Sequence, residues 1–299
     1  MTLYSLQQFE ALANYQSFSK AAETLFISQS ALSHTIQALE TELEVSLWER
    51  RGQQIILSPQ GEQFRMYCRK VLDEHENLQM ELNDRNDPFV NPLRLQMQVG
   101  FYPQRLLIRT FLNQYPRAKI QIYQAEQGRM AFYSLDLMIF TDDTAVPGDD
   151  AVFLFEEPLV LVTHRDHPLA SLPEIRLEDL QDYPGIQMQS SSSEKAEQLF
   201  RERGIYLSPI LETDHFHFAI RMLRNNEGWA LMPRYTMVPE NDPLLCSRVL
   251  RERDVRRRIW IQPVKSRYIS TVMKLFLDHS RAFFSGWGDS DLTGRGIDS

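Results

Sequence analysis

A segment with two unlike faces, SQSALSHTIQALE at residues 28–40, constrains this chain more than any other. Wound as a helix, it sets an apolar stripe against a face of short hydrogen-bonding side chains: Leu32, Ile36 and Leu39 against Ser30, His34, Gln37 and Thr41. Charged side chains would solubilise a face that only meets water. The uncharged face therefore predicts a polar partner, and the alternative is a solvated face on an ordinary helical bundle.

The residues around this segment predict a helix-turn-helix. Residues 1–46 have a helical pattern, with Ser19 as the expected N-cap of KAAETLF and Ser28 as the N-cap of the two-faced helix. Only Phe26 and Ile27 lie before that second cap, and alanines occupy positions where the two helices must approach closely. Two short helices joined so briefly are typical of the motif.

A wing and a long helix follow. Gly52 permits a tight turn before a short strand at residues 55–57, which places residues 50–54 at the tip of the wing. Ser58 and Pro59 then start a helix that runs to about Asp84. Its seam residues are spaced 4, 3, 4, 3 and 4 apart, the heptad pattern of a helix that pairs with a second one: Phe64, Cys68, Val71, His75, Leu78 and Leu82. Burial of this seam against its own domain is the alternative.

From about Leu93 onward, strand patterns and helix patterns alternate. Strands are expected at LRLQMQV, AKIQIYQ, LDLMIF, FEEPLVLVTH, IQMQ, PILETD, WALMP and RRRIWIQPV. Helices are expected at RLLIRTFLNQYP, SSSSEKAEQLFRERG, HFHFAIRMLRNNEG and SRYISTVMKLFLDHSRAFF. The alternation predicts an α/β domain with mostly parallel sheets, followed by a disordered tail at residues 286–299.

Composition limits the compartments and partners that we expect. The net charge is −8, and residues 1–58 carry three Lys and Arg residues against six Glu residues. If this segment binds DNA, it must use a few well-placed groups rather than a positive field. The chain has two cysteines, no signal-peptide pattern and no apolar run long enough to span a membrane, which predicts a cytoplasmic protein.

These features together resemble the LysR-type transcriptional regulators. The segment SLQQFEALANYQSFSKAAETLFISQSALSHTIQALETELEVSLWERRGQQIILSPQGEQF resembles the N-terminal domain of that family almost end to end. HPLA, LDLMIF and GWALMP resemble parts of its effector domain. The resemblance implies a multidomain fold, with an N-terminal all-α winged helix-turn-helix and a long linker helix. A two-lobed α/β effector domain like that of periplasmic binding proteins follows.

The expected domain boundaries follow from these patterns and from the resemblance. The winged helix-turn-helix takes residues 1–58, the linker and dimerisation helix residues 59–89, and the effector-binding domain residues 90–285. Within the effector-binding domain, lobe I takes about residues 90–161 and 258–285, and lobe II about residues 162–257.

The resemblance also implies which residues contact DNA. By position, five should face base edges in the major groove: Gln29, Ser30, Ser33, His34 and Gln37. Five more should face phosphate, the backbone or the adjacent minor groove: Lys20, Ser28, Arg50, Arg51 and Gln53. The family more often places Arg or Lys where His34 stands, so we expect lower affinity for DNA or a preference for lower pH.

A ligand in a two-lobed α/β domain usually binds between the lobes, near strand ends and helix N-termini. The resemblance places effector-binding candidates at Phe101, Tyr102, Pro103, Thr163, Ser190, Ser191, Ser192, His215 and Gly228. The serine run suits a carboxylate or phosphate, with simple helix capping as the alternative. Phe101 and Tyr102 also fit core positions. Residues 128–134 are shorter than the helix usual there in the family, which leaves the ligand class open.

The sequence therefore predicts a sequence-specific DNA-binding transcriptional regulator, modulated by a small-molecule effector bound between two lobes. Expected partners are double-stranded DNA with an interrupted palindrome, the effector, and further copies of the chain in a homodimer or homotetramer. No cofactor, metal or membrane is expected. No GxSxG, P-loop, GxGxxG, HExxH or CxxC pattern occurs, so an enzyme is not expected. The alternative is a cytoplasmic small-molecule-binding protein whose helical N-terminus only mediates dimerisation.

Overall fold

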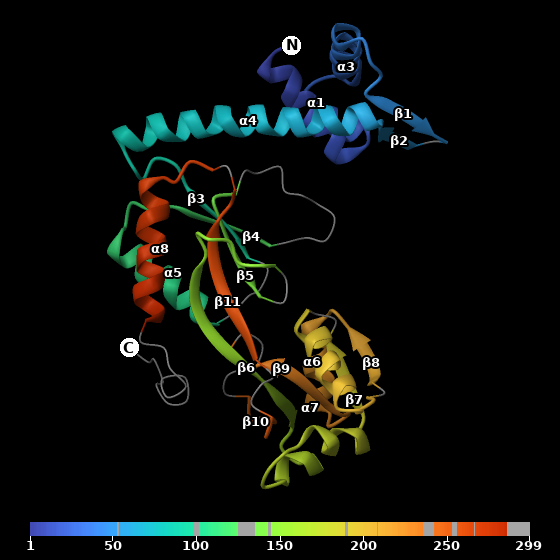
Figure 1. Ribbon diagram of the computed structural model, residues 1–299, viewed down its shortest axis with the longest axis vertical. Helices are drawn as coiled ribbons and strands as arrows, with labels where there is room; N and C mark the ends of the chain where they lie inside the picture. The colour runs from blue at the N-terminus through green and yellow to red at the C-terminus, as the bar shows by residue number, and fades with distance from the viewer. Residues whose placement is uncertain are drawn as a thin grey trace. The chain divides into compact units, whose positions relative to one another are not determined.

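The computed structural model describes residues 1–52, 54–97, 102–124, 135–142, 145–188, 191–207, 209–235, 242–252, 256–265 and 267–285 (Figure 1). The chain forms two compact units. The first contains residues 1–96, 118–136 and 264–273. The second contains residues 97–117, 137–263 and 274–299.

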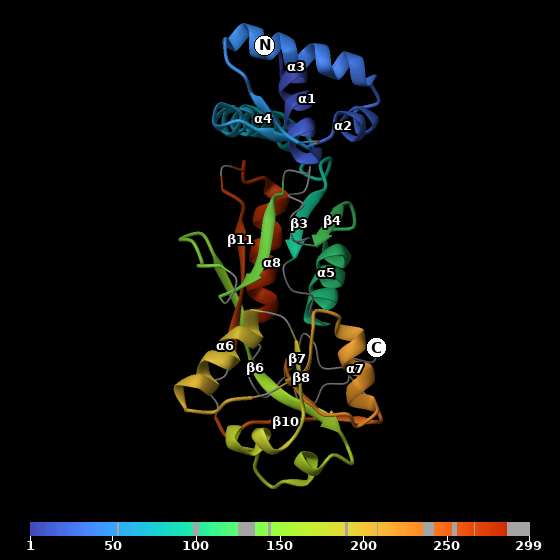
Figure 2. The same cartoon turned by 90° about the vertical axis from the view of Figure 1, so that its right-hand side faces the viewer.

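The first unit begins with the predicted helix-turn-helix, made of α1 (Leu3–Tyr15), α2 (Phe18–Thr24) and α3 (Gln29–Leu43). Figure 2 shows these three helices grouped together. Ser28 caps α3 as expected, because its Oγ accepts a hydrogen bond from the Ala31 amide at 3.1 Å. The expected cap of α2 is wrong. Ser17 has the extended backbone of a cap residue and Phe18 is already helical, so α2 begins before Ser19.

The wing is confirmed. Strands β1 (Trp48–Arg51) and β2 (Gln54–Leu57) pair antiparallel. Gly52, between them, has a φ of 65°, a left-handed conformation that glycine adopts without steric cost.

Helix α4 (Pro59–Asn86) starts where the sequence predicted. The Oγ of Ser58 accepts a hydrogen bond from the Gly61 amide at 2.9 Å, and proline occupies the first helical position. Gly61 lies against the strand that enters the wing. A Cβ built at this position would lie 2.1 Å from the carbonyl oxygen of Leu47, so only glycine fits without a shift.

One apolar core holds the N-terminal helices together. The stripe of α3 lies in it, at 0–3% exposure: Leu32, Ile36 and Leu39. Phe64 and Cys68 of α4 lie in the same core, and the rings of Phe9 and Phe64 meet edge to face at 4.8 Å. The heptad seam prediction is therefore wrong for Phe64 and Cys68, because α1 covers this face of α4.

The second half of α4 makes polar contacts with residues 264–273. The carboxylate of Asp84 accepts hydrogen bonds from the Thr271 amide and the Thr271 hydroxyl, at 3.1 and 2.9 Å. It also accepts one from the Tyr268 hydroxyl, at 3.2 Å. Thr271 is the first residue of α8 (Thr271–Phe284), so a carboxylate of the linker helix accepts the first amide of α8, which has no acceptor within that helix. In the same unit, β3 (Leu93–Met97) lies next to β4 (Ile120–Gln124).

The second unit is built on a sheet with the strand order β5-β11-β6-β9-β7-β8, and β10 pairs with β6. The strands are β5 (Leu137–Thr141), β6 (Val152–His164), β7 (Gly185–Met188), β8 (Pro209–Thr213), β9 (Trp229–Pro233), β10 (Leu245–Val249) and β11 (Arg256–Pro263). Strand β7 pairs parallel with β8 and β9. The expectation of mostly parallel sheets is nevertheless wrong, because β6 runs antiparallel to β9, β10 and β11.

Strand β6 belongs to both halves of this sheet. Its first half pairs with β11 and its second half with β9, and Figure 1 shows β6 and β11 side by side. Side chains of the second half alternate between two cores, as the period of a strand requires. Leu159 and Leu161 share a core with residues of α6 (Ser191–Glu202), whereas Val160 and Val162 share one with residues of α7 (Phe216–Arg224). The two helices therefore cover opposite faces.

The remaining helices of the second unit are α5 (Tyr102–Gln114), the greater part of α8 and two short 3-10 helices, η1 (Pro168–Ser171) and η2 (Leu177–Asp182). Helices α5 and α8 meet through Phe111 and Phe276, whose rings lie 4.9 Å apart edge to face. No helix in the described part of the chain is long and apolar enough to cross a membrane.

Candidate nucleic-acid interface

The polar face of α3 is accessible. Its apolar stripe lies in the core, and the polar side chains opposite are exposed, apart from the half-buried Ser33: Gln29, Ser30, His34, Gln37 and Thr41. A side chain that rests on the protein surface in this way keeps its donors and acceptors available to a partner. The leucine and isoleucine side chains on the opposite side of α3 pack into the domain core and hold the helix in place.

Gln29, the first residue of α3, is held by a neighbouring helix. The hydroxyl of Ser19 in α2 donates a hydrogen bond to the Gln29 Oε1 atom at 3.1 Å. The Nε2 group of Gln29, which carries two hydrogens, is then available to a partner. Sequence reasoning missed this role of Ser19, because the serine was assigned to a helix cap. The only sequence signal is a hydroxyl residue ten positions before a glutamine in a helix-turn-helix.

The N-terminus of α3 is suited to an anion. The Ser28 hydroxyl is already used, by the Ala31 amide and by the Ser30 hydroxyl at 3.0 Å. The amides of Gln29 and Ser30 lie in the first turn, where no intrahelical acceptor exists. These amides, with the positive end of the helix dipole, form the kind of site that binds phosphate.

Three exposed cations lie on other elements of the same domain. Lys20 lies on α2, and Arg50 and Arg51 lie on β1 of the wing, all exposed. Their charges are available to phosphate, because none of the three forms an ion pair with another residue that the structure describes. Gln53, the other wing residue expected at the DNA, lies outside the described residues.

Two carboxylates fix this surface to the rest of the domain. The Glu40 Oε1 atom, near the end of α3, accepts a hydrogen bond from the Leu47 amide at 2.7 Å and so ties α3 to the start of the wing. Glu10 of α1 forms ion pairs with Arg65 and Arg69 of α4, at 3.4 and 3.0 Å. The exposed face of α3 and the first part of α4 therefore belong to one packed domain.

Comparison with known proteins decides the family. Residues 3–62 match the family model described as "Bacterial regulatory helix-turn-helix protein, lysR family", and residues 91–285 match the "LysR substrate binding domain". The chain belongs to the LysR family. It is a DNA-binding transcriptional regulator with an effector-binding domain, as the sequence predicted. Double-stranded DNA and a small molecule are the partners that these two matched domains bind.

Relatives and solved structures extend over nearly the whole of this LysR-family chain. The HTH-type transcriptional regulator YvbU of Bacillus subtilis is 27% identical over 293 residues, covering 95% of this chain and 99% of that protein. Full-length OxyR from Pseudomonas aeruginosa is 21% identical with a TM-score of 0.70, over 97% of this chain and 98% of that one. Full-length CbnR complexed with its target DNA is 20% identical with a TM-score of 0.65, over 95% and 100%. The predicted fold class, including the two-lobed effector domain, is confirmed.

The structure does not describe the side chains of five of the nine effector-binding candidates. Phe101, Ser190 and the segment 128–134 lie outside the described residues, as does the tail at 286–299. The side chains of three more also lie outside, although their backbones are helical in α5 and α6: Tyr102, Ser191 and Ser192. Pro103 is buried in the first turn of α5.

The structure brings Thr163 and Gly228 close together. Thr163 on β6 lies opposite Trp229 on β9, the residue after Gly228. Thr163 is fully buried, and its hydroxyl lies 3.4 Å from the Cys246 Sγ atom on β10. Cys246 is a neighbour that sequence reasoning did not connect with this position, since β10 itself was not expected.

His215 and the other histidines form no metal centre in the described part of the chain. His215 is exposed at the cap of α7, and its Nε2 atom lies 3.7 Å from a carboxylate oxygen of Asp214. No group of three or more His, Cys, Asp or Glu side chains among the described residues is arranged to hold a metal ion. His167 is buried, and burial lowers the pKa of its imidazole.

Proposed function

We propose that this LysR-family regulator reads its operator through the exposed face of α3. Base edges in the major groove present donors and acceptors that Ser, Gln and His side chains match at short range: Gln29, Ser30, Ser33, His34 and Gln37. The observation that carries this proposal is the hydrogen bond between Ser19 and Gln29 at 3.1 Å. It orients the Gln29 amide before DNA arrives, which lowers the entropy lost on binding.

The second part of the proposal concerns the DNA backbone. The free amides at the start of α3 take one phosphate, and Ser28 lies beside it. Lys20 approaches the backbone from α2, and the wing residues Arg50, Arg51 and Gln53 approach the backbone or the adjacent minor groove. So small a number of cations predicts a shallow dependence of affinity on salt, with a slope set by the few phosphates neutralised.

The third part concerns pairing of two chains through α4. Leu78 and Leu82 are 54% and 52% exposed, one turn apart, and Val71 and His75 are half-buried. Exposed Tyr67 lies about three helical turns before Leu78, on the same face. We propose that these five residues form the dimer seam in place of the one that included Phe64 and Cys68. A two-fold dimer matches the two half-sites of an interrupted palindrome.

The fourth part concerns the effector. We propose that it binds near Thr163 and Gly228, with the serines at the start of α6 and His215 as further contacts. What supports this is that Thr163 pairs with Trp229, the residue after Gly228, so two candidates from distant parts of the sequence lie close together. Gly228 also has a structural role, because a Cβ there would lie 2.5 Å from the Pro184 carbonyl oxygen. Phe101, Tyr102, Pro103 and Ser190 stay part of this proposal. The chemical class of the effector is open.

We also keep the expected domain boundaries, the cytoplasmic location and the absence of catalytic activity as proposals. YvbU is a transcriptional regulator by its title, and both cysteines are free thiols, as a reducing compartment requires. A protein whose N-terminus only dimerises is not favoured, because the helix-turn-helix model of the family matches residues 3–62.

The test of the proposed DNA interface begins with selection of bound genomic fragments by the purified full-length protein, followed by footprinting. Arg51→Ala should weaken binding to all sequences alike and reduce the salt slope by about one. Ser33→Ala should instead relax the base preference and leave the salt slope unchanged. Thr41→Ala, at the far end of the same face, is the matched control. The proposal would be contradicted if Arg51→Ala and Ser33→Ala had the same affinity, salt slope and base preference as Thr41→Ala.

A further inference from the structure

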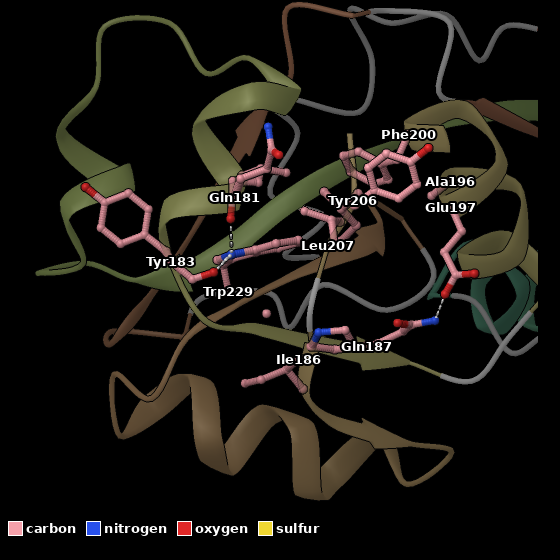
Figure 3. Close-up of a pocket in the computed structure, with 14 residues that line it drawn as sticks. Gln181, Tyr183, Ile186, Gln187, Ala196, Glu197, Phe200, Tyr206, Leu207 and Trp229 are labelled. Atoms are coloured by element: carbon pink, nitrogen blue, oxygen red, sulfur yellow. Dashed lines mark hydrogen bonds between the residues drawn. The ribbon is translucent and has the colours of Figure 1, made fainter. Parts of the chain in front are cut away.

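A cavity of about 120 Å³ lies in the second unit, between α6, η2 and the sheet (Figure 3). Its lining differs from that of the proposed effector site, because none of the candidate effector residues lines it, although Trp229 follows Gly228 and pairs with Thr163. Its wall includes exposed residues, Gln181 and Tyr206, so the cavity reaches the protein surface.

Trp229 forms one side of the cavity and is fixed in place. Its indole nitrogen donates hydrogen bonds to the carbonyl oxygens of Leu180 and Tyr183, at 3.2 and 3.0 Å, drawn as dashed lines in Figure 3. The ring lies against Gly185, where a Cβ would be 3.1 Å from the indole. With its polar atom satisfied and its ring held against the backbone, Trp229 presents a rigid apolar surface to the cavity.

The facing wall comes from α6. Ala196 and Phe200 lie one turn apart on the buried side of this helix, at 4% and 3% exposure. Figure 3 shows Phe200 and Tyr206 together on one side of Trp229. Ala196 is the small residue of this wall, and the short side chain leaves room that a larger residue would fill.

One polar pair borders the cavity. The Gln187 amide nitrogen donates a hydrogen bond to the Glu197 Oε1 atom, and the other carboxylate oxygen of Glu197 pairs with Arg201 at 2.7 Å. Glu197 is the charged residue among those that line the cavity. Arg201 compensates its charge, and its carboxylate oxygens have lone pairs left that can accept a hydrogen bond from a hydroxyl group.

We propose that this cavity is a second ligand site, for a small neutral aromatic molecule that carries a hydroxyl group. The size fits one ring, since an apolar cavity of about 150 Å³ in another protein binds benzene. The rigid aromatic wall favours an aromatic ring, and Glu197 favours a hydroxyl over a carboxylate. A ligand in contact with Ala196 and Phe200 holds α6, the helix whose first turn carries the candidate effector serines.

The experiment follows 4-fluorophenol by fluorine NMR with the full-length protein. We expect a Kd on the order of 1 mM, the range of a ligand with so few atoms. Ala196→Leu should raise this Kd at least about tenfold, because the added carbons occupy the cavity. Gln198→Leu, which adds a leucine to the exposed side of the same helix, is the matched control and should keep the Kd within about twofold.

Two comparisons make the proposal falsifiable. 4-Fluorobenzoate should bind at least about tenfold more weakly than 4-fluorophenol, because its carboxylate has no hydrogen to donate to Glu197 and loses its hydration in an apolar cavity. Ala196→Met, which adapts its shape more readily, replaces Ala196→Leu if that variant does not fold. The proposal is overturned if 4-fluorophenol does not bind the wild type, if the filled variant binds it equally well, or if the benzoate binds more tightly.

Discussion

The change Arg267→Met tests how much a buried ion-pair cluster contributes to the stability of the unit that contains the linker helix. The guanidinium is 2% exposed and contacts two carboxylates, Asp136 at 3.2 Å and Glu76 of α4 at 3.1 Å. Asp136 is 1% exposed and also accepts a hydrogen bond from the Arg94 amide at 2.8 Å. Methionine fills a similar space without charge, so the change removes the cation and leaves the buried carboxylate.

The expected cost follows from the burial of both partners. Removing one member of a buried ion pair costs about 3–5 kcal/mol, chiefly because the remaining charge is left without compensation. An exposed pair costs far less, about 0.2–1 kcal/mol. Since a folded domain is stable by about 5–15 kcal/mol, Arg267→Met should consume a large part of the stability of the first unit.

The assay is urea unfolding of the full-length protein, with near-ultraviolet circular dichroism as the signal. Arg85→Met is the matched control, because Arg85 is also an α4-associated cation but is 71% exposed in its pair with Glu81. Arg267→Met combined with Asp136→Asn should recover at least about half of the lost stability, since the second change removes the uncompensated charge. A loss below about 1 kcal/mol in Arg267→Met, or no recovery in the double variant, would refute the reasoning.

The same pair predicts a dependence on pH. Burial raises the pKa of Asp136 above its ordinary value, although the Arg94 amide and Arg267 lower it. A carboxyl group whose folded pKa is raised contributes stability at low pH that is lost as pH rises through the folded pKa. Arg267→Met removes one of the groups that lower this pKa, so Asp136 of the variant takes up its proton at a higher pH than Asp136 of the wild type. Protonation removes the uncompensated charge, so the deficit of Arg267→Met relative to the wild type should be smaller at about pH 4.5 than at about pH 7.5.

Three further predictions concern α4 and the cysteines. Gly61→Ala should destabilise the DNA-binding domain by about 3 kcal/mol, measured by thermal unfolding, because the new Cβ meets the Leu47 carbonyl; an unchanged midpoint would contradict the close approach. Leu78→Asp should raise the dimer Kd by roughly thirtyfold in sedimentation experiments, and an unchanged Kd would remove Leu78 from the seam. Burial raises the pKa of the Cys68 thiol to about 12, so a thiol reagent at about pH 8 should modify Cys246 first and Cys68 only on unfolding. Modification of folded Cys68 at the rate of Cys246 would contradict its burial.

Much of the fold could be predicted because each element repeats a local pattern. The stripe of α3, the cap at Ser28 and the proline start of α4 each depend on residues within a few positions of one another. The heptad of α4 was equally regular, yet Phe64 and Cys68 face α1. An apolar stripe at helical spacing predicts that one face of the helix is buried. It does not show whether that face packs against the same chain or against a second copy.

The parts that sequence reasoning missed depend on residues distant in the chain. Arg267 and Asp136 meet across 131 positions, and no local pattern marks either as a partner. Strand β10 is short and half polar, so its pairing with β6 leaves little periodicity to detect. The bond between Ser19 and Gln29 crosses two helices, and only the angle between them brings the two side chains together.

The central claim, that the exposed face of α3 reads DNA sequence, is tested most directly at Gln29. The measurement is the affinity of the wild type and of Gln29→Ala for a panel of operators, each changed at one base pair. We predict that Gln29→Ala loses about 1–3 kcal/mol on the natural operator and becomes indifferent to the base pair at one position of each half-site. Wild-type discrimination retained by Gln29→Ala at every position would contradict the claim.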